Sequence, residues 1–497
     1  MVKDYQHIIQ KYFDQHSIVE ANLKSFDNFM EKMMQQIVNE TQDIIPTIIP
    51  PEVQDFKIKL NKIVVGKPQI IEADGSVRDI YPTEARLRKL TYSSPLNLEV
   101  SAHIDGVQRD SFTAQIGKIP VMVRSKFCHL HNMNQEERIA EGEDPQDKGG
   151  YFILNGNERV LIVVEDLASN RFVVEKNNTT KKYIGKLYAE QGSYRIPHNI
   201  TQLKDGLTHL SFTRFKNIPI ILAIKALGLT KDKEIMAAVC GDDKTFDEIT
   251  VNLINMAQIK NAEAATEELA KIVGIAQFDQ KKERIDEMLD RYLLPHIGMT
   301  QDVRIQKAHT LCKLLRKFWL TTTGQLGKED KDHYINKRLK LSGDLLGDLF
   351  RMNLRALVQD MLYNFQRLVK RGKFHSIKII IRDNLLTSRI KSAMATGTWV
   401  GGRKGISQNL DKTNFLASMS HTQRVVSLLS ATQENFAARA LHPTHWGRLG
   451  PVETPEGTPI GLRKNLAILC DITSTEPSEE KIRKMLEIYG LKGVQQK

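Results

Sequence analysis

Basic side chains crowd the stretch 388–424, which holds a single acidic residue. The basic residues are Arg389, Lys391, Arg403, Lys404, Lys412 and Arg424, and the acid is Asp411. Clustered Lys and Arg are the electrostatic footprint of a protein that binds the phosphate backbone of nucleic acid. Glycines among these charges let the main chain approach a nucleic-acid strand closely. They are Gly397, Gly401, Gly402 and Gly405. Each basic residue alone is as well explained by a solvated surface, but together with the glycines they favour nucleic acid.

Amide and imidazole side chains in the same stretch can hydrogen-bond a sugar or a base edge. They are Gln408, Asn409, Asn414 and His421. Lys and Arg supply phosphate contacts that ignore base sequence, whereas side chains of this second kind can add contacts to sugars and bases. The stretch therefore carries both kinds of group that a nucleic-acid interface uses.

The stretch 441–462 is shaped by proline and glycine. Its residues of these types are Pro443, Gly447, Gly450, Pro451, Pro455, Gly457, Pro459 and Gly461. Neither a long helix nor a central strand tolerates such a composition, so we expect a rigid, irregular path that holds Arg448, Glu453 and Glu456 in place. Paired carboxylates can perform general acid–base catalysis. No nucleophile or set of metal ligands accompanies Glu453 and Glu456, so an independent hydrolase is the weaker hypothesis.

Motifs of nucleotide and metal binding are incomplete in this chain. The run Gly397–Lys404 resembles a P-loop, but arginine follows its last glycine and no Ser or Thr follows Lys404. Two short clusters of possible zinc ligands offer only two or three side chains each: Cys128, His129 and His131, and His442 and His445. Packing and backbone hydrogen bonding are the favoured roles for both clusters. We therefore predict no catalytic residue and no metal site in this chain.

Composition points to a multidomain protein with an anionic partner. The chain has 497 residues, with 71 Lys and Arg against 59 Asp and Glu, a net charge of +12. At roughly 100–200 residues per domain this length predicts several domains, and the charge favours association with nucleic acid. The four cysteines are widely separated, which indicates a reducing compartment and predicts a cytoplasmic protein. No run of about 18 apolar residues suggests a transmembrane helix.

Hydrophobic patterns divide the chain into helical and extended stretches. Helical spacing predicts helices at 4–40, within 221–318, at 354–368 and at 479–488. Alternation and turn dipeptides predict strands within 53–125, 149–166, 167–220 and 466–473, with turns at Asp74–Gly75, Asp105–Gly106 and Asn155–Gly156. The acidic stretch 136–147 is predicted to be a solvated loop. We expect the apolar stripe of 4–40 to pack against the rest of the chain, with partner binding as the less favoured alternative.

Several long blocks resemble the second-largest, β-like subunit of multisubunit DNA-directed RNA polymerases. They are VRSKFCHL (123–130), GGYFILNGNERVLI (149–162), DKDHYINKRLKLSGDLLGDLFR (330–351), TGTWVGGRKGISQ (396–408), SQNLDKTNFLASMSHTQRVVS (407–427) and HPTHWGRLGPVETPEGTPIGL (442–462). These blocks occur in the family's order, and the resemblance covers essentially the whole chain. The full subunit is about twice as long in most lineages, so the chain resembles its N-terminal half, as in the B″ polypeptide of the split form found in some archaea; a truncation is the rival explanation.

The resemblance implies an α+β, multidomain fold with mixed β-sheets and helical insertions. The implied parts are a first protrusion segment (1–165), a lobe (166–328), a second protrusion segment (329–390), a fork region (391–465) and the start of an external or hybrid-side domain (466–497) that continues in a partner chain.

The resemblance also implies the site and its partners. In the family, the matching segments line the RNA–DNA hybrid and the downstream fork, which assigns hybrid or template binding to Arg403, Lys404, Gln408, Asp411, Asn414, His421, Arg424, Arg448, Glu453 and Glu456. The implied partners are the B′ polypeptide, the largest subunit, template DNA and nascent RNA. Nucleotidyl transfer is implied only in the assembled complex, with Mg²⁺ on other subunits. A stand-alone nucleic-acid-binding scaffold is the alternative hypothesis.

Overall fold

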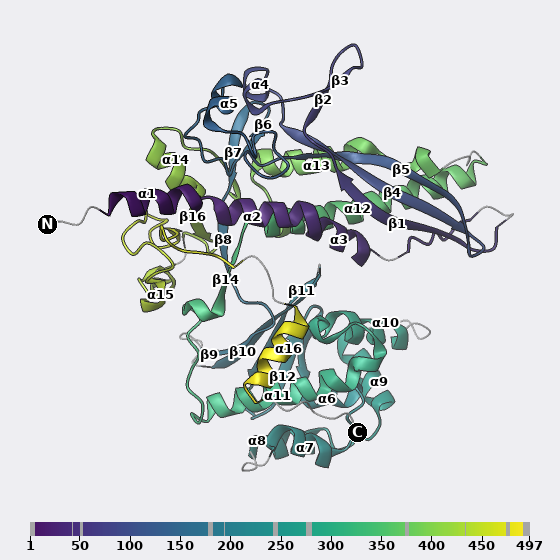
Figure 1. The fold of residues 1–497 in the computed structure, drawn as a ribbon. Helices are drawn as coiled ribbons and strands as arrows, with labels where there is room; N and C mark the ends of the chain where they lie inside the picture. Colours follow the sequence, from purple (N-terminus) through teal and green to yellow (C-terminus); the bar gives the residue numbers. More distant parts are fainter. Residues whose placement is uncertain are drawn as a thin grey trace. The chain divides into compact units, whose positions relative to one another are not determined.

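The chain divides into two compact units. A computed structural model describes residues 5–41, 43–49, 53–176, 182–192, 194–241, 247–274, 281–372, 377–432, 434–473 and 478–490 (Figure 1). The first unit combines Met1–Asp166 with Leu339–Lys497, and the second is Leu167–Arg338. Some residues of the stretches predicted as helix or strand lie outside the described residues. They are 4, 177–181, 193, 242–246 and 275–280. The α+β, multidomain fold class is confirmed, because both units combine helices with sheets.

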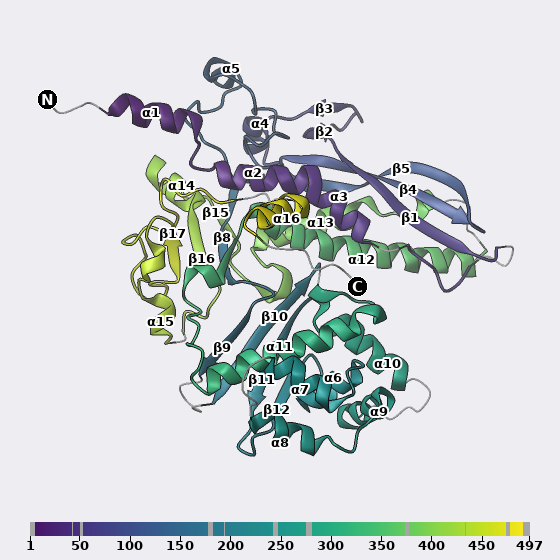
Figure 2. The same cartoon turned by 60° about the horizontal axis from the view of Figure 1, so that its bottom comes forward.

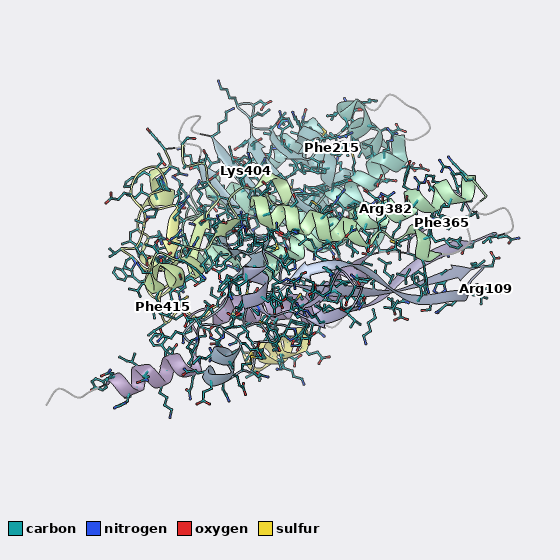
Figure 3. The ribbon with its side chains drawn as sticks, turned by 90° about the horizontal axis from the view of Figure 1, so that it is seen from above. Arg109, Phe215, Phe365, Arg382, Lys404 and Phe415 are labelled. Carbon is teal, nitrogen blue, oxygen red and sulfur yellow. The ribbon has the colours of Figure 1, made fainter. Side chains whose placement is uncertain are left out.

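An antiparallel sheet of order β1-β4-β5 forms one side of the first unit. Its strands are β1 (Phe56–Val65), β4 (Ser93–Ile104) and β5 (Val107–Pro120). Asp105 and Gly106 have φ angles of +50° and +79° between β4 and β5, as a tight hairpin turn requires. Figure 3 shows Arg109 at the far end of this hairpin. The turn Asp74–Gly75 lies between the paired strands β2 (Gln69–Ile71) and β3 (Val77–Asp79), so both predicted hairpins are confirmed.

Long helices cover this sheet. Helices α12 (Ser342–Lys370) and α13 (Asp383–Thr396) lie against it (Figures 1 and 2), and the rings of Phe56 on β1 and Phe365 on α12 stack with centroids 4.6 Å apart. The predicted helix at 354–368 is therefore part of a longer one. Three consecutive helical segments near the start of the chain pack on α12. They are α2 (Glu20–Asn28), the π-helical turn η1 (Phe29–Met33) and α3 (Met34–Glu40).

The predicted apolar stripe of 4–40 packs only in part. Phe26 and Phe29 are fully buried, which confirms the prediction for the second half of the stripe. Ile8 and Ile9 on α1 (Gln6–Gln15) are 66% and 57% exposed, so the prediction is wrong for the first half within the described residues. The chain leaves helical geometry at His16, whose φ and ψ are −119° and 102°, and this break separates α1 from the packed helices.

Two small sheets of the first unit carry the residues of interest. One has the order β15-β7-β6, with β6 (Phe152–Leu154), β7 (Asn157–Leu161) and β15 (Ser407–Asn409). In the other, β16 (Arg424–Ser427) pairs in parallel with β8 (Val163–Leu167) and antiparallel with β17 (Arg463–Asn465). The predicted turn Asn155–Gly156 joins β6 to β7. Strands from distant parts of the sequence thus bring the chain around 160 beside the chain around 408–465.

Short helices complete the first unit. They are α4 (Pro82–Leu87), α5 (Gln135–Ala140), η7 (Ile377–Ile380), η8 (Val400–Gly402), α14 (Phe415–Thr422), α15 (Phe436–Arg439), η9 (Pro443–His445) and α16 (Glu479–Ile488). Helix α16 matches the helix predicted at 479–488. No element longer than η9 occurs within 441–462, as the proline and glycine content predicts.

Two local predictions are wrong. The stretch 136–147 contains most of α5 instead of being loop throughout, because the Glu137 carboxylate accepts a hydrogen bond from the Asn134 main-chain N–H at 2.8 Å and caps the helix. The last strand is Arg463–Asn465, not 466–473. Pairing with β16 ends at Asn465, and Ile468 and Leu469 are exposed beyond it.

The second unit packs helices on a five-stranded antiparallel sheet of order β13-β12-β11-β10-β9. The strands are β9 (Phe172–Lys176), β10 (Tyr183–Gln191), β11 (Tyr194–Gln202), β12 (Thr208–Phe212) and β13 (Phe215–Pro219). The helices are α6 (Ile220–Ala226), α7 (Asp232–Cys240), α8 (Asp247–Asn255), α9 (Ala262–Val273), α10 (Lys281–Glu287), η3 (Met288–Tyr292), η4 (Pro295–Ile297), η5 (Gln301–Val303) and α11 (Arg304–Thr322). After them comes η6 (Tyr334–Asn336). Strand β14 (Lys337–Lys340) crosses the boundary between the two units and lies next to β8 in the sheet of order β14-β8-β16-β17. The predicted strands within 167–220 and helices within 221–318 are confirmed in the described residues.

No described helix in either unit is both long enough and apolar enough to cross a bilayer.

Candidate nucleic-acid interface

The glycine-rich loop after α13 is anchored at both ends and open in the middle. Gly397 ends α13 with a φ of +73°, and a Cβ there would lie 2.6 Å from the carbonyl oxygen of Ser407. Trp399 donates its indole N–H to the carbonyl of Leu345 at 2.8 Å and its main-chain N–H to the carbonyl of Arg403 at 2.7 Å. A Cβ on Gly401 would meet nothing within 4 Å. The loop is thus a fixed turn with free space around its tip.

The two basic residues of this loop differ in their surroundings. Arg403 forms an ion pair with Asp166, with 3.0 Å between Nη2 and Oδ2, and both side chains are partly buried. Lys404 is exposed, and no hydrogen bond or ion pair reaches its ammonium group from the described residues. Figure 3 shows Lys404 away from Phe415, which begins α14. Of the two, only Lys404 offers its full charge to an outside partner.

A buried histidine connects β15 to α14. Nδ1 of His421 accepts a hydrogen bond from the main-chain N–H of Asp411 at 3.0 Å, so Nε2 carries the proton and donates it to Oε1 of Gln408 at 3.2 Å. This arrangement requires a neutral ring. Burial and the nearby positive charge of Arg424 lower the pKa of His421 to about 4. Gln408, Asp411 and His421 therefore hold one another in place, which their spacing in the sequence did not reveal.

Asp411 and Asn414 shape the turn that leads into α14. Oδ1 of Asp411 accepts hydrogen bonds from the N–H of Thr413 at 3.0 Å and from its hydroxyl at 2.7 Å, and these bonds lower the pKa of the Asp411 carboxyl group. Oδ1 of Asn414 accepts from the N–H of Ala417 at 2.7 Å and caps the helix. Both residues have local structural partners, and Asp411 also lies close enough to Arg424 to affect its pKa.

Arg424 is a half-buried cation that forms no ion pair with a described residue, although the charges of Asp411 and Glu453 act on it at longer range. It starts β16, and burial together with the charge of Arg463 on β17 lowers the pKa of its guanidinium. Within the described part of the chain, no carboxylate lies within the 4.0 Å of an ion pair from either arginine. Arg463 was missed in the sequence because it lies just beyond the quoted motif. The adjacent basic residue Lys464 was the sequence feature that could have pointed to Arg463.

The loop 441–462 is held by its flanks. Arg439 donates from Nη1 to the carbonyls of Thr458 and Ile460 at 2.6 and 3.0 Å. Gly461 has a φ of +72°, and a Cβ there would lie 2.3 Å from the carbonyl oxygen of Arg439. The predicted rigid path is therefore built by close main-chain contact.

The three site residues predicted in this loop are not equivalent. Glu453 accepts a hydrogen bond from the Ser420 hydroxyl at 2.6 Å, and Ser420 accepts one from Asn465 at 2.9 Å. Arg448 is exposed and donates to the carbonyl of Thr444 at 3.2 Å. Glu456 is exposed without a hydrogen bond or ion pair to any described residue. A shared acid–base site of Glu453 and Glu456 has no support in these contacts.

A buried ion pair fixes β17. Nζ of Lys464 lies 3.0 Å from Oε2 of Glu165 on β8, and both residues are buried. The two strands flank β16, so this pair clamps the strand that begins with Arg424. Sequence analysis missed it because the partners are 299 positions apart.

The possible zinc ligands have ordinary roles. The thiol of Cys128 accepts from the hydroxyl of Tyr92 at 3.4 Å, and His442 accepts from the N–H of Thr444 at 3.2 Å. Across the described ranges, no group of three His, Cys, Asp or Glu side chains is arranged to hold a metal ion.

The structure thus gathers six residues into what we call the Arg424 cluster: Gln408, Asp411, His421, Arg424, Glu453 and Arg463. Five of them were predicted as site residues, and Arg463 was not. Arg403, Lys404, Asn414, Arg448 and Glu456 have no described contact with the cluster. Among the described residues neither arginine of the cluster forms an ion pair, although the carboxylates of Asp411 and Glu453 act on Arg424 at longer range. Both arginines lie on strands of one sheet, β16 and β17, and a guanidinium without an ion-pair partner can bind an anion.

Comparison with protein families decides between the hypotheses. Residues 17–388 match the model of the RNA polymerase beta subunit, and residues 408–472 match that of RNA polymerase Rpb2, domain 3. The chain belongs to the family of second-largest subunits of DNA-directed RNA polymerases. The resemblance seen in the sequence is confirmed, and with it the identity of the chain as a nucleotidyltransferase subunit in place of a stand-alone scaffold.

Individual relatives show which part of the polymerase subunit this is. The chain is 41% identical to DNA-directed RNA polymerase subunit Rpo2N of Methanocaldococcus jannaschii, over 97% of this chain and 98% of that subunit. It is 36% identical to Rpo2N of Halobacterium salinarum, over 99% and 97%. Against subunit Rpo2 of Saccharolobus shibatae it is 38% identical over 98% of this chain but 43% of the relative. The chain therefore matches the N-terminal part, in the form found as Rpo2N in lineages with a split subunit.

Proposed function

We propose that this chain forms one wall of the DNA cleft in a cytoplasmic RNA polymerase and positions the RNA–DNA hybrid and the downstream fork. The observation that carries the proposal is the Arg424 cluster, where neither the half-buried guanidinium of Arg424 nor that of Arg463 forms an ion pair with a described residue. Its expected partners are template DNA, nascent RNA, the B′ polypeptide and the largest subunit.

A phosphate is the group that this cluster fits best. Burial removes part of the hydration of the Arg424 guanidinium, and the positive charge of Arg463 repels it. Both effects make the charged form of Arg424 less favourable, and an anion bound between the two arginines would offset them. Guanidinium groups pair with phosphate oxygens through two parallel hydrogen bonds. The ion pair between Lys464 and Glu165 already holds the flanking strands in place. Binding an anion therefore costs little conformational entropy in this part of the chain.

The role that follows is positioning and charge stabilisation. His421 is neutral and both its ring nitrogens hold main-chain or side-chain partners, so it orders the turn before α14. Glu453 is tied to Ser420. We propose that Mg²⁺ chemistry takes place on other subunits, while this wall fixes the path of the hybrid; in phosphoryl transfer, positioning and electrostatics supply most of the rate.

Replacing Arg424 with alanine tests the proposal in reconstituted polymerase. If Arg424 contacts a phosphate, Arg424→Ala should shorten the lifetime of elongation complexes and lower the salt dependence of their stability by about one unit of log slope. Arg291→Ala is the matched control, because Arg291 is an exposed arginine on η3 whose ion pair joins Glu287 at the end of α10. An unchanged slope for Arg424→Ala would remove the phosphate contact from the proposal.

A further inference from the structure

A small pocket lies in the second unit, on the face of its sheet that points away from the core. Strands β9 and β10 pair there (Figures 1 and 2), and the segment 331–336 completes the lining. Successive residues of a strand point to opposite faces of a sheet. Phe172, Val174 and Leu187 belong to the buried core, so their neighbours in the two strands point to the pocket. These neighbours are Arg171, Val173, Glu175, Lys186 and Tyr188.

The lining of the pocket carries an excess of positive charge. Its charged side chains are Arg171, Lys186 and Lys331 against Glu175, which gives 3 − 1 = +2. The charged residues next to the lining do not reverse the sign, because including them gives 5 − 4 = +1. They are Lys317, Lys337, Glu329, Asp330 and Asp332. A negatively charged ligand is therefore favoured over a positively charged one.

One carboxylate in the lining is shared by two ammonium groups. Nζ of Lys331 lies 3.2 Å from Oε2 of Glu175, and Lys186 pairs with the other oxygen, Oε1. Each ammonium group has three N–H donors, so both lysines keep donors for a further partner. Glu175 thus orders the two lysines without neutralising both.

Arg171 has weak partners in the described part of the chain. Its Nη2 lies 3.9 Å from Oε1 of Glu329, and that oxygen is closer to Nζ of Lys317, at 3.0 Å. Its Nη1 donates to the carbonyl of Ile335 at 3.4 Å. A guanidinium has five N–H donors in a planar fork that matches an oxyanion. Most of this donor capacity is open to a ligand.

Asn336 adds a hydrogen-bond acceptor to the lining. The residue is 4% exposed, and its Nδ2 donates to the carbonyl of Asp330 at 2.6 Å. A carbonyl can only accept, so this bond fixes which amide atom is nitrogen. Among the described residues, Oδ1 of Asn336 has no hydrogen-bond partner. A buried acceptor without a donor is unfavourable, and a ligand that carries a hydrogen-bond donor would remove this cost.

The size of the pocket suits a small ion. Its volume is about 90 Å³, and one water molecule takes up about 30 Å³ of the liquid. The pocket has room for a few waters or for one tetrahedral oxyanion, but not for a nucleotide. Size, charge and the free acceptor together call for a small oxyanion that still carries a proton.

We infer that this pocket binds a hydrogen phosphate ion. The phosphate oxygens accept hydrogen bonds from Arg171, Lys186 and Lys331, and the remaining O–H donates to Oδ1 of Asn336. A bound ion would tie the segment 331–336 to the paired strands β9 and β10. The site lies wholly in the second unit, so it does not depend on the role of the Arg424 cluster.

Isothermal titration calorimetry on the full chain tests the inference with three oxyanions at constant ionic strength. Inorganic phosphate is expected to bind. Sulfate has the same shape but no O–H at neutral pH, and we expect it to bind at least about tenfold more weakly. Phosphoserine tests a phosphorylated side chain as the source of the phosphate. At about pH 8 it lies above its second pKa of about 6 and has lost its phosphate O–H, so it too should bind more weakly than inorganic phosphate.

Two substitutions in the lining should change phosphate binding in opposite directions. Arg171→Ala removes the main donor and should weaken binding at least about fivefold, whereas Glu175→Gln removes the competing carboxylate and should strengthen it about threefold. Arg214→Ala is the matched control and should have no effect, because Arg214 is an exposed arginine of the same unit in the turn between β12 and β13.

Several results would overturn the inference. Sulfate or phosphoserine that binds as tightly as inorganic phosphate would show that no proton on the ligand is recognised. Equal effects of Arg171→Ala and Arg214→Ala would show that phosphate binds elsewhere. No phosphate binding up to about 20 mM would show that the pocket holds only water.

Discussion

At the scale of single residues, the candidate interface depends on which charges are neutralised within the chain. Arg403 and Arg424 look alike in the sequence, yet Arg403 is paired with Asp166 and Arg424 has no described counter-ion. The sequence shows that basic residues are dense between 388 and 424, but not which of them have internal partners. That distinction requires Asp166, which lies 237 positions from Arg403.

His421 should make the local structure sensitive to acid. Its pKa of about 4 in the fold is below the ordinary 6.5, so the unfolded turn binds a proton first as pH falls, and stability is lost between about pH 6.5 and 4. We expect hydrogen–deuterium exchange of the peptide around Asp411, corrected for intrinsic rate, to accelerate over this range. His421→Asn should abolish the pH dependence. Unchanged protection of the Asp411 amide at about pH 4.5 would contradict the neutral, accepting Nδ1.

At the scale of elements, the strands that hold the site come from three distant segments. Hairpins and long helices were predictable, because turn dipeptides and apolar spacing are local signals. The site frame was not, because β16 pairs in parallel with β8 and antiparallel with β17 across long stretches of sequence. The position of β17 was missed for the same reason. By composition the apolar run 466–473 is a better strand candidate than Arg463–Asn465, but the strand forms where the chain pairs with β16.

Among the glycines of the loop before β15, Gly397 should be the one whose replacement destabilises the fold most. Gly397→Ala combines a positive φ with a Cβ 2.6 Å from the Ser407 carbonyl, and we expect a loss of about 2–3 kcal/mol in the unfolding free energy of this unit. Gly401→Ala is the control, because its φ of +76° is similar but the space is open, so about 1 kcal/mol is expected. Equal losses in chemical denaturation would show that the clash is relieved by movement of the loop.

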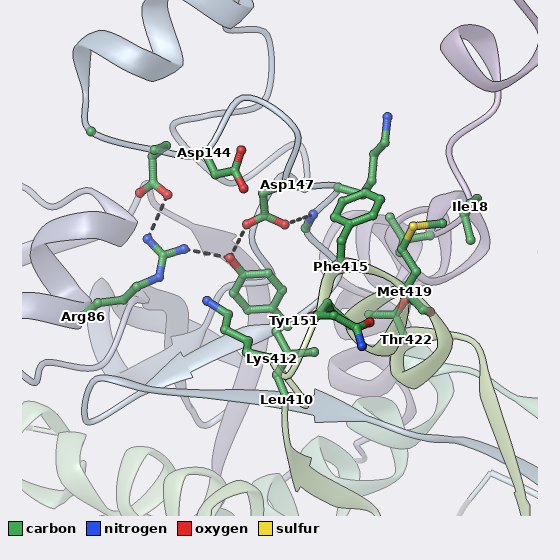
Figure 4. Close-up of a pocket in the computed structure, with 17 residues that line it drawn as sticks. Ile18, Arg86, Asp144, Asp147, Tyr151, Leu410, Lys412, Phe415, Met419 and Thr422 are labelled. Atoms are coloured by element: carbon green, nitrogen blue, oxygen red, sulfur yellow. Dashed lines mark hydrogen bonds and ion pairs between the residues drawn. The ribbon is translucent and has the colours of Figure 1, made fainter. Parts of the chain in front are cut away.

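At the scale of the whole molecule, the chain is one component of a larger enzyme. It spans 98% of the Rpo2N subunit of Methanocaldococcus jannaschii but 43% of the Rpo2 subunit of Saccharolobus shibatae. The family was evident from long sequence blocks. A cavity of about 440 Å³ next to α14 was not evident, because its lining comes from four separate stretches, 18–19, Arg86, 142–151 and 410–422, that carry no shared motif (Figure 4).

The most direct test of the central claim is site-specific photo-crosslinking in a reconstituted elongation complex. A crosslinking amino acid at exposed Arg463, beside Arg424, should capture nucleotides of the RNA–DNA hybrid. The same group at Leu87, which is 79% exposed on α4, serves as the control for surface accessibility and should not capture the hybrid. Hybrid crosslinks from position 463 alone are the predicted result. An active complex that gives none from position 463 would contradict the account.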